Sequence, residues 1–498
     1  MTRTIAIVAL LTLGGSVSVL QGQGYSLRLD SRVQRVDFRG VSEDSISEAA
    51  TVTGPTGGPV TPDGVAVSCD PAGICRFFLP GPVIRAAPLS QSAAFTAWGF
   101  GVTGLSIHAD GRLLTDLSSS DAWPGTEPAL QLLQAYVEYT RAALTATLGR
   151  QAMFTRLGPT NFDGARVTVR AGTTGLAIEG WAGWGLARAT ALPITSPALN
   201  PLDEFRPSQR STVFGTAVDY GGREGHARLD YQRELDGRSD YLVAERAAFS
   251  GDARIAGRVT LSGGAEYDLA QGFWGSADVQ ARYVTPMVTA AVQARHYRPH
   301  FDLWTIWGAF SPVPFNSISA AAWYRPRRSV ELHARGERYW FEPAEASSPL
   351  TTAEDDGWRA SVGTAVDLSA AWRAELDGHR EFGPGAASRG IDAAVSFRPD
   401  AHLELRASGA ALQRPLEFRY DDASVSMFGV DADWEASDRV RTGVGIARYW
   451  ETRDRPDAAA FDWSQTRLSA RLTLVFGGAR PIPLPPARPR QSSRHVPP

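Results

Sequence analysis

The chain has 498 residues, of which 43% are hydrophobic and 21% charged, and its formal net charge is -3. This length allows several ordinary domains or one large barrel, and the balanced charge gives no reason to expect a nucleic-acid partner. The mean hydropathy of -0.18 suits a soluble chain. It also suits a membrane barrel, because only every second residue of a membrane-spanning strand has to be apolar.

The first residues have the pattern of a secretory signal peptide. Arg3 is followed by the apolar run 5–13 (IAIVALLTL) and then by the small and polar residues GGSVSVLQGQG. A basic start, a short apolar segment and small residues before a cut define such a peptide, so we predict a signal peptide over residues 1–24. Gly22 and Gly24 form one small pair before the cut, and Ser16 and Ser18 form a second; the alternative is a buried N-terminal element.

The two cysteines, Cys69 and Cys75, lie in the stretch SCDPAGICRFF. Export to an oxidising compartment makes a disulfide between them the expected state. A metal site would need further ligands nearby, and the nearest histidine is distant in sequence, so we expect no metal here.

Alternation of apolar and polar residues recurs through most of the remaining chain. In HARLDYQRE, for example, Ala227, Leu229 and Tyr231 alternate with polar residues, the pattern of a strand with two unlike faces. The alternating segments commonly run for about 10 to 14 residues, whereas strands of soluble proteins average about five or six and membrane strands need about 9 to 11. We place about 22 strands, with a range of about 20 to 24, between residues 26 and 477.

The connections between these segments also alternate. Short linkers such as 221–224 and 398–400 follow the even-numbered strands, and longer ones follow most odd-numbered strands, including 40–91, 118–130 and 188–210. Membrane barrels have short periplasmic turns and longer extracellular loops, and a closed sheet leaves no unpaired backbone in lipid. Tyrosine and tryptophan also recur near the segment ends, where a membrane interface favours them.

Together these features resemble the outer-membrane β-barrel proteins of Gram-negative bacteria, broadly the porins. The stretch 144–169 (LTATLGRQAMFTRLGPTNFDGARVTV) is similar to a "GRQ … FDGARV" pattern of porin-like and alginate-export-like barrels. The resemblance implies an all-β fold, a single large closed antiparallel barrel over residues 25–477, located in the outer membrane and surrounded by its lipid. It also implies passive diffusion of small hydrophilic solutes; the alternative is a structural or export-associated barrel that binds a partner.

The polar face of the later strands carries dense charge of both signs. If these residues face the lumen, they form a wall of opposed charges that would tune which solutes pass; the alternative is a set of ion pairs that only brace the barrel. The pore-lining candidates are Glu331, His333, Arg335, Glu337, Arg359, Arg373, Glu375, Asp377, His402, Glu404 and Arg406.

No other function has comparable support. No Ser lies in a Gly-x-Ser-x-Gly elbow, no phosphate loop is present, and we expect neither an enzyme nor a cofactor. A barrel of this size matches TonB-dependent transporters, which carry a plug domain before the barrel, and nothing of plug size precedes the first strand here. We expect residues 40–91, the long first loop with Cys69 and Cys75, to cap or constrict the lumen; the alternative is a disordered loop.

The last strand closes the predicted sheet. In LSARLTLVFGG we expect Leu468, Ala470, Leu472, Leu474 and Phe476 to face lipid, and Ser469, Arg471 and Thr473 to face the lumen beside the first strand. Barrels of this kind commonly end on the last aromatic residue, whereas here Phe476 is followed by further chain. Residues 478–498 are rich in proline, which cannot continue a ladder, so we expect a disordered periplasmic tail that could contact the cell wall or a partner.

Overall fold

The computed structural model describes residues 24–55, 57–118, 130–172, 174–186, 211–237, 241–298, 314–342, 356–383, 386–415, 422–454 and 461–477. The predicted signal peptide, apart from Gly24, and the predicted tail over 478–498 lie outside these residues. Within the described ranges, no helix is long and apolar enough to span a bilayer.

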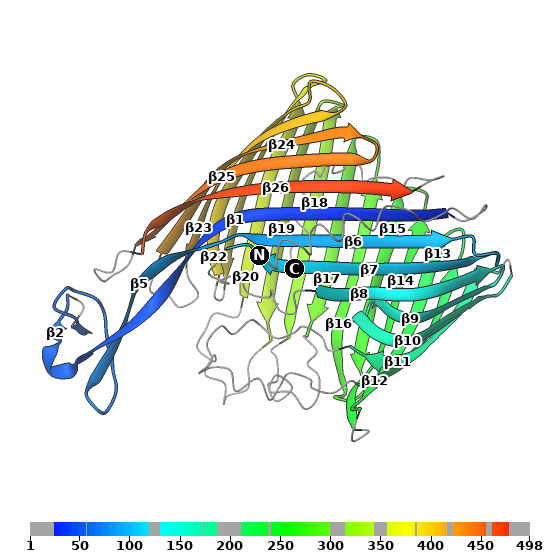
Figure 1. The fold of residues 1–498 in the computed structure, drawn as a ribbon, viewed down its shortest axis with the longest axis horizontal. Coiled ribbons are helices and arrows are strands. Elements are labelled where there is room, and N and C mark those ends of the chain that lie inside the picture. Colours follow the sequence, from blue (N-terminus) through cyan, green and yellow to red (C-terminus); the bar gives the residue numbers. More distant parts are fainter. Residues whose placement is uncertain are drawn as a thin grey trace, which may run out of the picture.

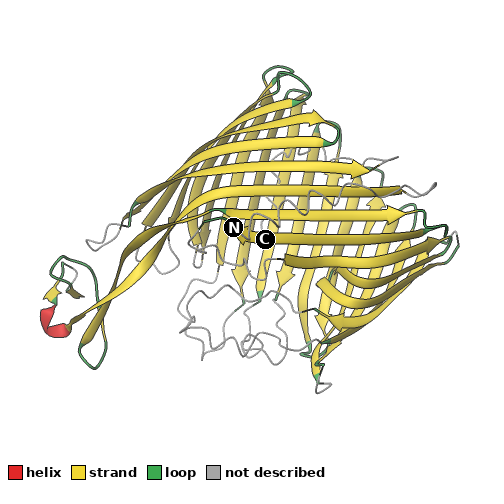
Figure 2. Cartoon of the chain, viewed as in Figure 1, coloured by secondary structure: helices red, strands yellow, loops and turns green. Residues whose placement is uncertain are grey.

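The molecule is a single antiparallel sheet that closes on itself into a barrel of 22 strands (Figures 1 and 2). β1 pairs with β26 on one side and with β6 on the other, which completes the ring. The barrel strands are β1 (Gly24–Ser47), β6 (Pro88–Trp98), β7 (Leu105–Asp116), β8 (Leu130–Arg141), β9 (Leu144–Thr155), β10 (Gly158–Arg170), β11 (Leu176–Gly185), β12 (Thr212–Gly221), β13 (Gly225–Leu235), β14 (Leu242–Ile255), β15 (Val259–Asp268), β16 (Phe273–Val284), β17 (Val288–Tyr297), β18 (Phe315–Arg327), β19 (Val330–Phe341), β20 (Asp356–Asp367), β21 (Trp372–Gly383), β22 (Ala386–Phe397), β23 (Leu403–Pro415), β24 (Asp422–Ser437), β25 (Val440–Asp454) and β26 (Trp463–Gly477).

This architecture confirms the predicted fold class and strand number. One end of the barrel has only short turns, such as 142–143, 222–224 and 438–439, and most connections at the other end are longer. We therefore assign the short-turn end, where β1 begins, to the periplasm and the opposite end to the outside.

The two faces of the wall differ in the way the alternation predicted. On β19, Leu332 points outward and is 44% exposed, while its neighbour Glu331 points inward and is 7% exposed. Val362 on β20 also points outward, with 65% of its surface exposed. Apolar side chains thus form the outer surface that contacts lipid, and the inner surface is polar.

The seam between the first and last strands has the predicted register. Leu29 pairs with Leu474 and Leu27 with Phe476 on the outward face. On the inward face, the Thr473 hydroxyl donates a 2.7 Å hydrogen bond to Asp30, and Arg471 Nε donates a 2.8 Å hydrogen bond to Asp433. The expectation that the last strand pairs with the first is confirmed.

Residues 40–91 differ from the expected long loop, because much of this segment is strand. β1 continues past the barrel edge and pairs with β5 (Ile74–Ala86) as far as Ser47, and this two-stranded ribbon projects away from the barrel (Figure 1). Figure 1 shows the ribbon extending beyond the barrel and not into its lumen, in contrast to the cap or constriction expected for this segment. Beyond it lie a short 3-10 helix, η1 (Glu48–Ala50), and the two-residue strands β2 (Val52–Thr53), β3 (Pro59–Val60) and β4 (Ser68–Cys69).

The ribbon is held at both ends. At its tip, Cys69 and Cys75 are joined by a disulfide, and Val65 and Phe77 form a small buried cluster. Nearer the barrel, Arg39 donates a 2.9 Å hydrogen bond to the backbone oxygen of Asp462, just before β26. An isolated pair of strands is only marginally stable in water, so these contacts explain how the ribbon keeps its shape.

Candidate functional site

The inner surface of the barrel is the candidate site, because it is the surface that a solute would meet. Strands β19 to β23 bring most of the predicted pore-lining residues together on this face. The register pairs Glu337 with Arg359, and it pairs Asp377 with Asp392 and Ser396 with Arg406 on the following strands. Inward positions on neighbouring strands therefore form rows of polar side chains that run around the wall.

Glu337 is the centre of the first charged group. Its side chain is 4% exposed and accepts hydrogen bonds from Arg359 at 2.8 and 3.0 Å and from Arg335 at 3.2 Å. Two guanidinium groups thus share one carboxylate, and Glu381, which lies opposite Arg359 in the register, adds a second carboxylate at this level of the wall. Closer to the periplasm on the same strand, Glu331 pairs with Arg325 at 2.5 Å.

A second group joins strands that are not adjacent. His333 on β19 and Asp377 on β21 meet across β20, with 2.5 Å between His333 Nε2 and Asp377 Oδ1. The residue between them in the register is Gly363, and a Cβ atom there would overlap both side chains. Glycine is therefore required at this position by the close approach of two side chains.

Glu375 forms a third group near the periplasmic end. It accepts hydrogen bonds from Arg373 at 2.8 Å and from Arg406 at 3.1 Å, and Arg373 also pairs with Asp367 at 3.1 Å. Glu404 pairs separately with Arg398 at 2.6 Å.

His402 lies apart from these groups, since it precedes β23 and belongs to a periplasmic turn. Its ring nitrogen Nδ1 lies 3.0 Å from the backbone oxygen of Glu435. The other predicted residues lie on the inner wall, and His402 lies at its rim.

The structure adds a feature that the sequence analysis missed, at the turn between β9 and β10. Arg156 in this turn donates a 2.5 Å hydrogen bond to Asp278 on β16, and Thr160 donates one of 2.9 Å to Gln232 on β13. β10 and β16 are six strands apart, or roughly 29 Å along the wall at about 4.8 Å per strand. The tip of the β9–β10 hairpin therefore leans into the lumen and contacts the wall on another side.

A buried apolar cluster supports this leaning hairpin. Met153 of β9 and Phe162 of β10 pack with Trp181, Val213 and Ala217 of β11 and β12. These side chains occupy inward positions that are polar elsewhere in the barrel, and Phe162 is 0% exposed. Burial of such side chains is worth about 1.5 to 3 kcal/mol each, so the cluster holds the hairpin against the inner wall.

The "GRQ … FDGARV" stretch forms this same hairpin. Gln151 donates a 3.1 Å hydrogen bond to the backbone oxygen of Gly164. Arg150 and Asp163 face outward and form a bidentate pair with distances of 2.8 and 3.0 Å. The motif thus consists of cross-strand contacts that brace β9 against β10.

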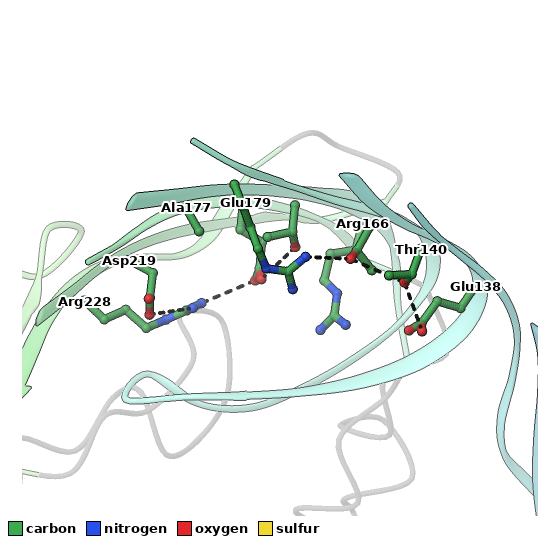
Figure 3. A pocket seen from close by; sticks show the side chains of 10 residues that line it. Glu138, Thr140, Arg166, Ala177, Glu179, Asp219 and Arg228 are labelled. Atoms are coloured by element: carbon green, nitrogen blue, oxygen red, sulfur yellow. Dashed lines mark hydrogen bonds and ion pairs between the residues drawn. The ribbon is translucent and has the colours of Figure 1, made fainter. Parts of the chain in front are cut away.

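Beside the hairpin, at the periplasmic end, the inner wall is hollowed by a recess of about 400 Å³ (Figure 3). Arg228 on its wall pairs with Glu179 at 3.3 Å and with Asp219 at 3.8 Å. Arg166, in contrast, has no hydrogen-bond or ion-pair partner among the residues that the structure describes, and Figure 3 shows its side chain in the recess. Glu138 lines the same recess, so a solute there meets the guanidinium group of Arg166 together with a carboxylate.

The described residues contain no group of His, Cys, Asp and Glu that could hold a metal ion. Glu337, Glu375 and Glu404 on the wall are paired with arginines instead. Such an arrangement can orient water and act on passing ions, because fixed charges in a pore set which ions enter.

No protein-family model matches the chain, and no curated protein matches it. Solved structures are similar in fold. The copper transporter OprC aligns over 92% of this chain and 81% of that chain, with 10% identity and a TM-score of 0.45. The siderophore receptor PirA from Pseudomonas aeruginosa aligns over 90% and 80%, with 10% identity and a TM-score of 0.48. OccK3 (OpdO) of Pseudomonas aeruginosa aligns over 94% and 99%, with 12% identity and a TM-score of 0.37.

At such identities the likeness concerns the fold alone. The closed even-numbered barrel, its apolar outer face and its polar lumen define the class of protein. The chain has the fold of the Gram-negative outer-membrane β-barrel proteins, and its place is the outer membrane.

Proposed function

We propose that the barrel is a passive channel for small hydrophilic solutes. The observation that supports this function is the polar inner wall of β19 to β23, on which Glu337, Glu375 and their arginine partners face the lumen. A polar lumen holds water, and the opposed charges of the wall act on the ions that cross it. No cofactor takes part in this function.

The leaning β9–β10 hairpin supplies the size filter in this proposal. It narrows the lumen at the level where Arg156 contacts Asp278. The recess that Arg166 and Glu138 line lies towards the periplasmic end, so a solute passes a narrow section and charged groups of both signs. The hairpin takes the constricting role that the sequence had suggested for residues 40–91.

Conductance across a planar bilayer tests the proposal. The refolded full chain should give discrete current steps in potassium chloride, and the double variant Arg335→Glu, Arg373→Glu should shift the reversal potential towards cation selectivity. Arg338→Gln is the matched control, since Arg338 lies on the same strand as Arg335 but faces outward. A folded protein that leaves the bilayer silent would count against the channel.

A partner-binding role is the second candidate, and the ribbon of β1 and β5 favours it. This ribbon projects beyond the barrel and exposes Val41, Phe78 and Val83, each more than half exposed. Truncating residues 41–79 to a short turn should leave conductance unchanged if the channel alone is the function. A loss of envelope integrity in cells with this truncation would favour the partner-binding role.

A further inference from the structure

The recess of the inner wall beside the β9–β10 hairpin has charged groups of both signs in equal number. Its lining contains three arginines and three carboxylates, namely Arg166, Arg170, Arg228, Glu138, Glu179 and Asp219. A solute with a single charge meets attraction and repulsion there in similar measure. A solute that carries one positive and one negative charge can instead place each of them beside a group of opposite sign.

Four of these six groups already have partners in the wall. Arg228 pairs with Glu179 and Asp219, and Arg170 donates a 2.9 Å hydrogen bond to the hydroxyl of Thr145. These contacts fix the shape of the recess and reduce what the four groups can offer to a solute.

The other two groups, Arg166 and Glu138, have most of their hydrogen-bonding capacity free. Within the described ranges, Arg166 has no hydrogen-bond or ion-pair partner, and Glu138 accepts one hydrogen bond, of 3.4 Å, from the hydroxyl of Thr140. Figure 3 shows both side chains in the recess, with no interaction between them. A guanidinium group has five N–H donors and a carboxylate accepts about four hydrogen bonds, so one cation and one anion are available to a solute.

The register places these two groups at the same level of the wall. Glu138 of β8 and Arg166 of β10 both pair with Thr147 of β9, so they are two strands apart, or about 9.6 Å at about 4.8 Å per strand. Thr147 is 4% exposed, and its hydroxyl has no hydrogen-bond partner among the described residues. Its short side chain lies below the two longer ones and does not separate their charged ends.

We propose that Arg166 and Glu138 bind the carboxylate and the ammonium group of a free α-amino acid. A guanidinium fork matches a carboxylate with two parallel hydrogen bonds, and Glu138 accepts hydrogen bonds from the ammonium group. Two charge-assisted hydrogen bonds of about 2.8 Å leave roughly 4 Å of the strand separation for the solute, which suits two charges that a single carbon atom separates. The inference rests on the proposed function for the route by which a solute reaches the recess.

Binding to the refolded full chain in detergent tests the assignment, measured by saturation-transfer NMR near neutral pH. The probes are L-alanine, which carries both charges, L-alaninamide, which keeps only the ammonium group, and N-acetyl-L-alanine, which keeps only the carboxylate. We expect alanine to bind about tenfold or more tightly than either analogue, because each analogue loses one hydrogen-bonded ion pair.

Variants of the two residues locate the binding. Arg166→Gln and Glu138→Gln should each weaken alanine binding by about tenfold. The exchange variant Glu138→Arg, Arg166→Glu should recover most of the affinity, because an α-amino acid can bind the exchanged charges in the reverse orientation. Arg112→Gln is the matched control. Arg112 lies on the inner wall outside the recess and donates a 2.6 Å hydrogen bond to Gln131, so its replacement should leave alanine binding unchanged.

The binding measurement and the bilayer measurement fail separately. Equal affinity for alanine and both analogues, or unchanged alanine binding in Arg166→Gln and Glu138→Gln, would overturn the inference, whatever current the bilayer shows. A protein that leaves the bilayer silent, yet binds alanine through these two residues, would overturn the passive channel and support the binding site.

Discussion

Arg156 and Asp278 are joined across the lumen by a hydrogen bond of 2.5 Å, although they belong to a turn and a strand that lie far apart around the wall. The side chains are 16% and 29% exposed, so the pair is shielded from bulk water more than a surface ion pair is. The position of the hairpin tip in the lumen depends on this contact and on the cluster around Phe162.

The first prediction concerns this contact. Asp278→Asn should weaken the attachment of the hairpin tip, and the single-channel conductance should rise, because the tip can then move away from β16. The exchange variant Arg156→Asp, Asp278→Arg restores a pair of opposite charges and should restore most of the original conductance. Equal conductance in all three proteins would show that the hairpin does not limit the current.

The second prediction concerns Phe162, which is fully buried under the hairpin. Phe162→Ala leaves a cavity and should lower the free energy of unfolding by about 3 to 5 kcal/mol, measured by urea titration in detergent. Phe154→Ala on the same hairpin is the matched control, since Phe154 is 79% exposed. Similar losses in both variants would mean that the cluster does not support the hairpin.

A third prediction follows from the carboxylate that Arg335 and Arg359 share. Glu337→Gln removes its charge and should shift the reversal potential towards anions, with a loss of about 1.5 to 3 kcal/mol in stability. Asp356→Asn breaks the exposed outward pair with Arg338 and should cost less than about 1 kcal/mol without a change in selectivity. An unchanged reversal potential for Glu337→Gln would remove this group from the list of selectivity determinants.

The outward orientation of the last strand leads to a fourth prediction. Leu472 points to lipid near the middle of the wall, so Leu472→Arg should cost about 2 to 4 kcal/mol in folding into lipid vesicles. The neighbouring Arg471 faces the lumen and pairs with Asp433. Arg471→Gln should cost at most about 1 kcal/mol, as for other exposed pairs; a harmless Leu472→Arg would contradict the assigned faces.

The fifth prediction is a pH dependence at a periplasmic turn. The backbone N–H groups of His402 and Leu403 donate hydrogen bonds to Asp400, and these bonds lower the pKa of its carboxyl below 3.8. A group whose pKa is lower in the folded state contributes stability above its unfolded pKa and loses it as the pH falls through the folded pKa. The Tm difference between the unmodified protein and Asp400→Asn should therefore be present at neutral pH and shrink as the pH falls below 3.8.

Asp438→Asn provides the comparison for this measurement. Asp438 is exposed in another short turn, and no hydrogen bond from the described residues reaches its carboxylate. Its replacement should give no such pH-dependent difference. A Tm difference for Asp400→Asn that stays constant from pH 7 to pH 3 would contradict the role of the two backbone bonds.

Most of the barrel could be predicted from the alternation of apolar and polar side chains. Side chains that face lipid must be apolar, those that face the water of the lumen can be polar, and successive residues of a strand face opposite sides. Leu332 and Glu331 follow this rule, and so do the seam residues Leu472 and Thr473. Charged lumen candidates could be chosen for the same reason. The hydrogen-bond and ion-pair partners of these candidates could not be predicted. The contact of His333 with Asp377 across Gly363, for example, depends on the register of three strands.

The hairpin and the ribbon escaped prediction for physical reasons. Phe162 and Trp181 are apolar at inward positions, which breaks the pattern, and their presence there was the one available signal of packing inside the lumen. In the ribbon, Pro80 and Pro82 would interrupt a central strand, because proline cannot donate a ladder hydrogen bond. β5 can hold them there because it pairs only with β1 over this length, and an edge strand tolerates proline.

The ribbon bears on the order in which the wall assembles. β1 pairs with β5 and β6, which are close to it in sequence. The other edge of β1 pairs with β26 at the far end of the chain, where Ser26 pairs with Gly477. Pairing between close segments forms before pairing that requires a long loop to close. β1 can therefore already be paired with β5 and β6 before β26 folds. Closing the barrel then requires only that β26 pairs with the free edge of β1.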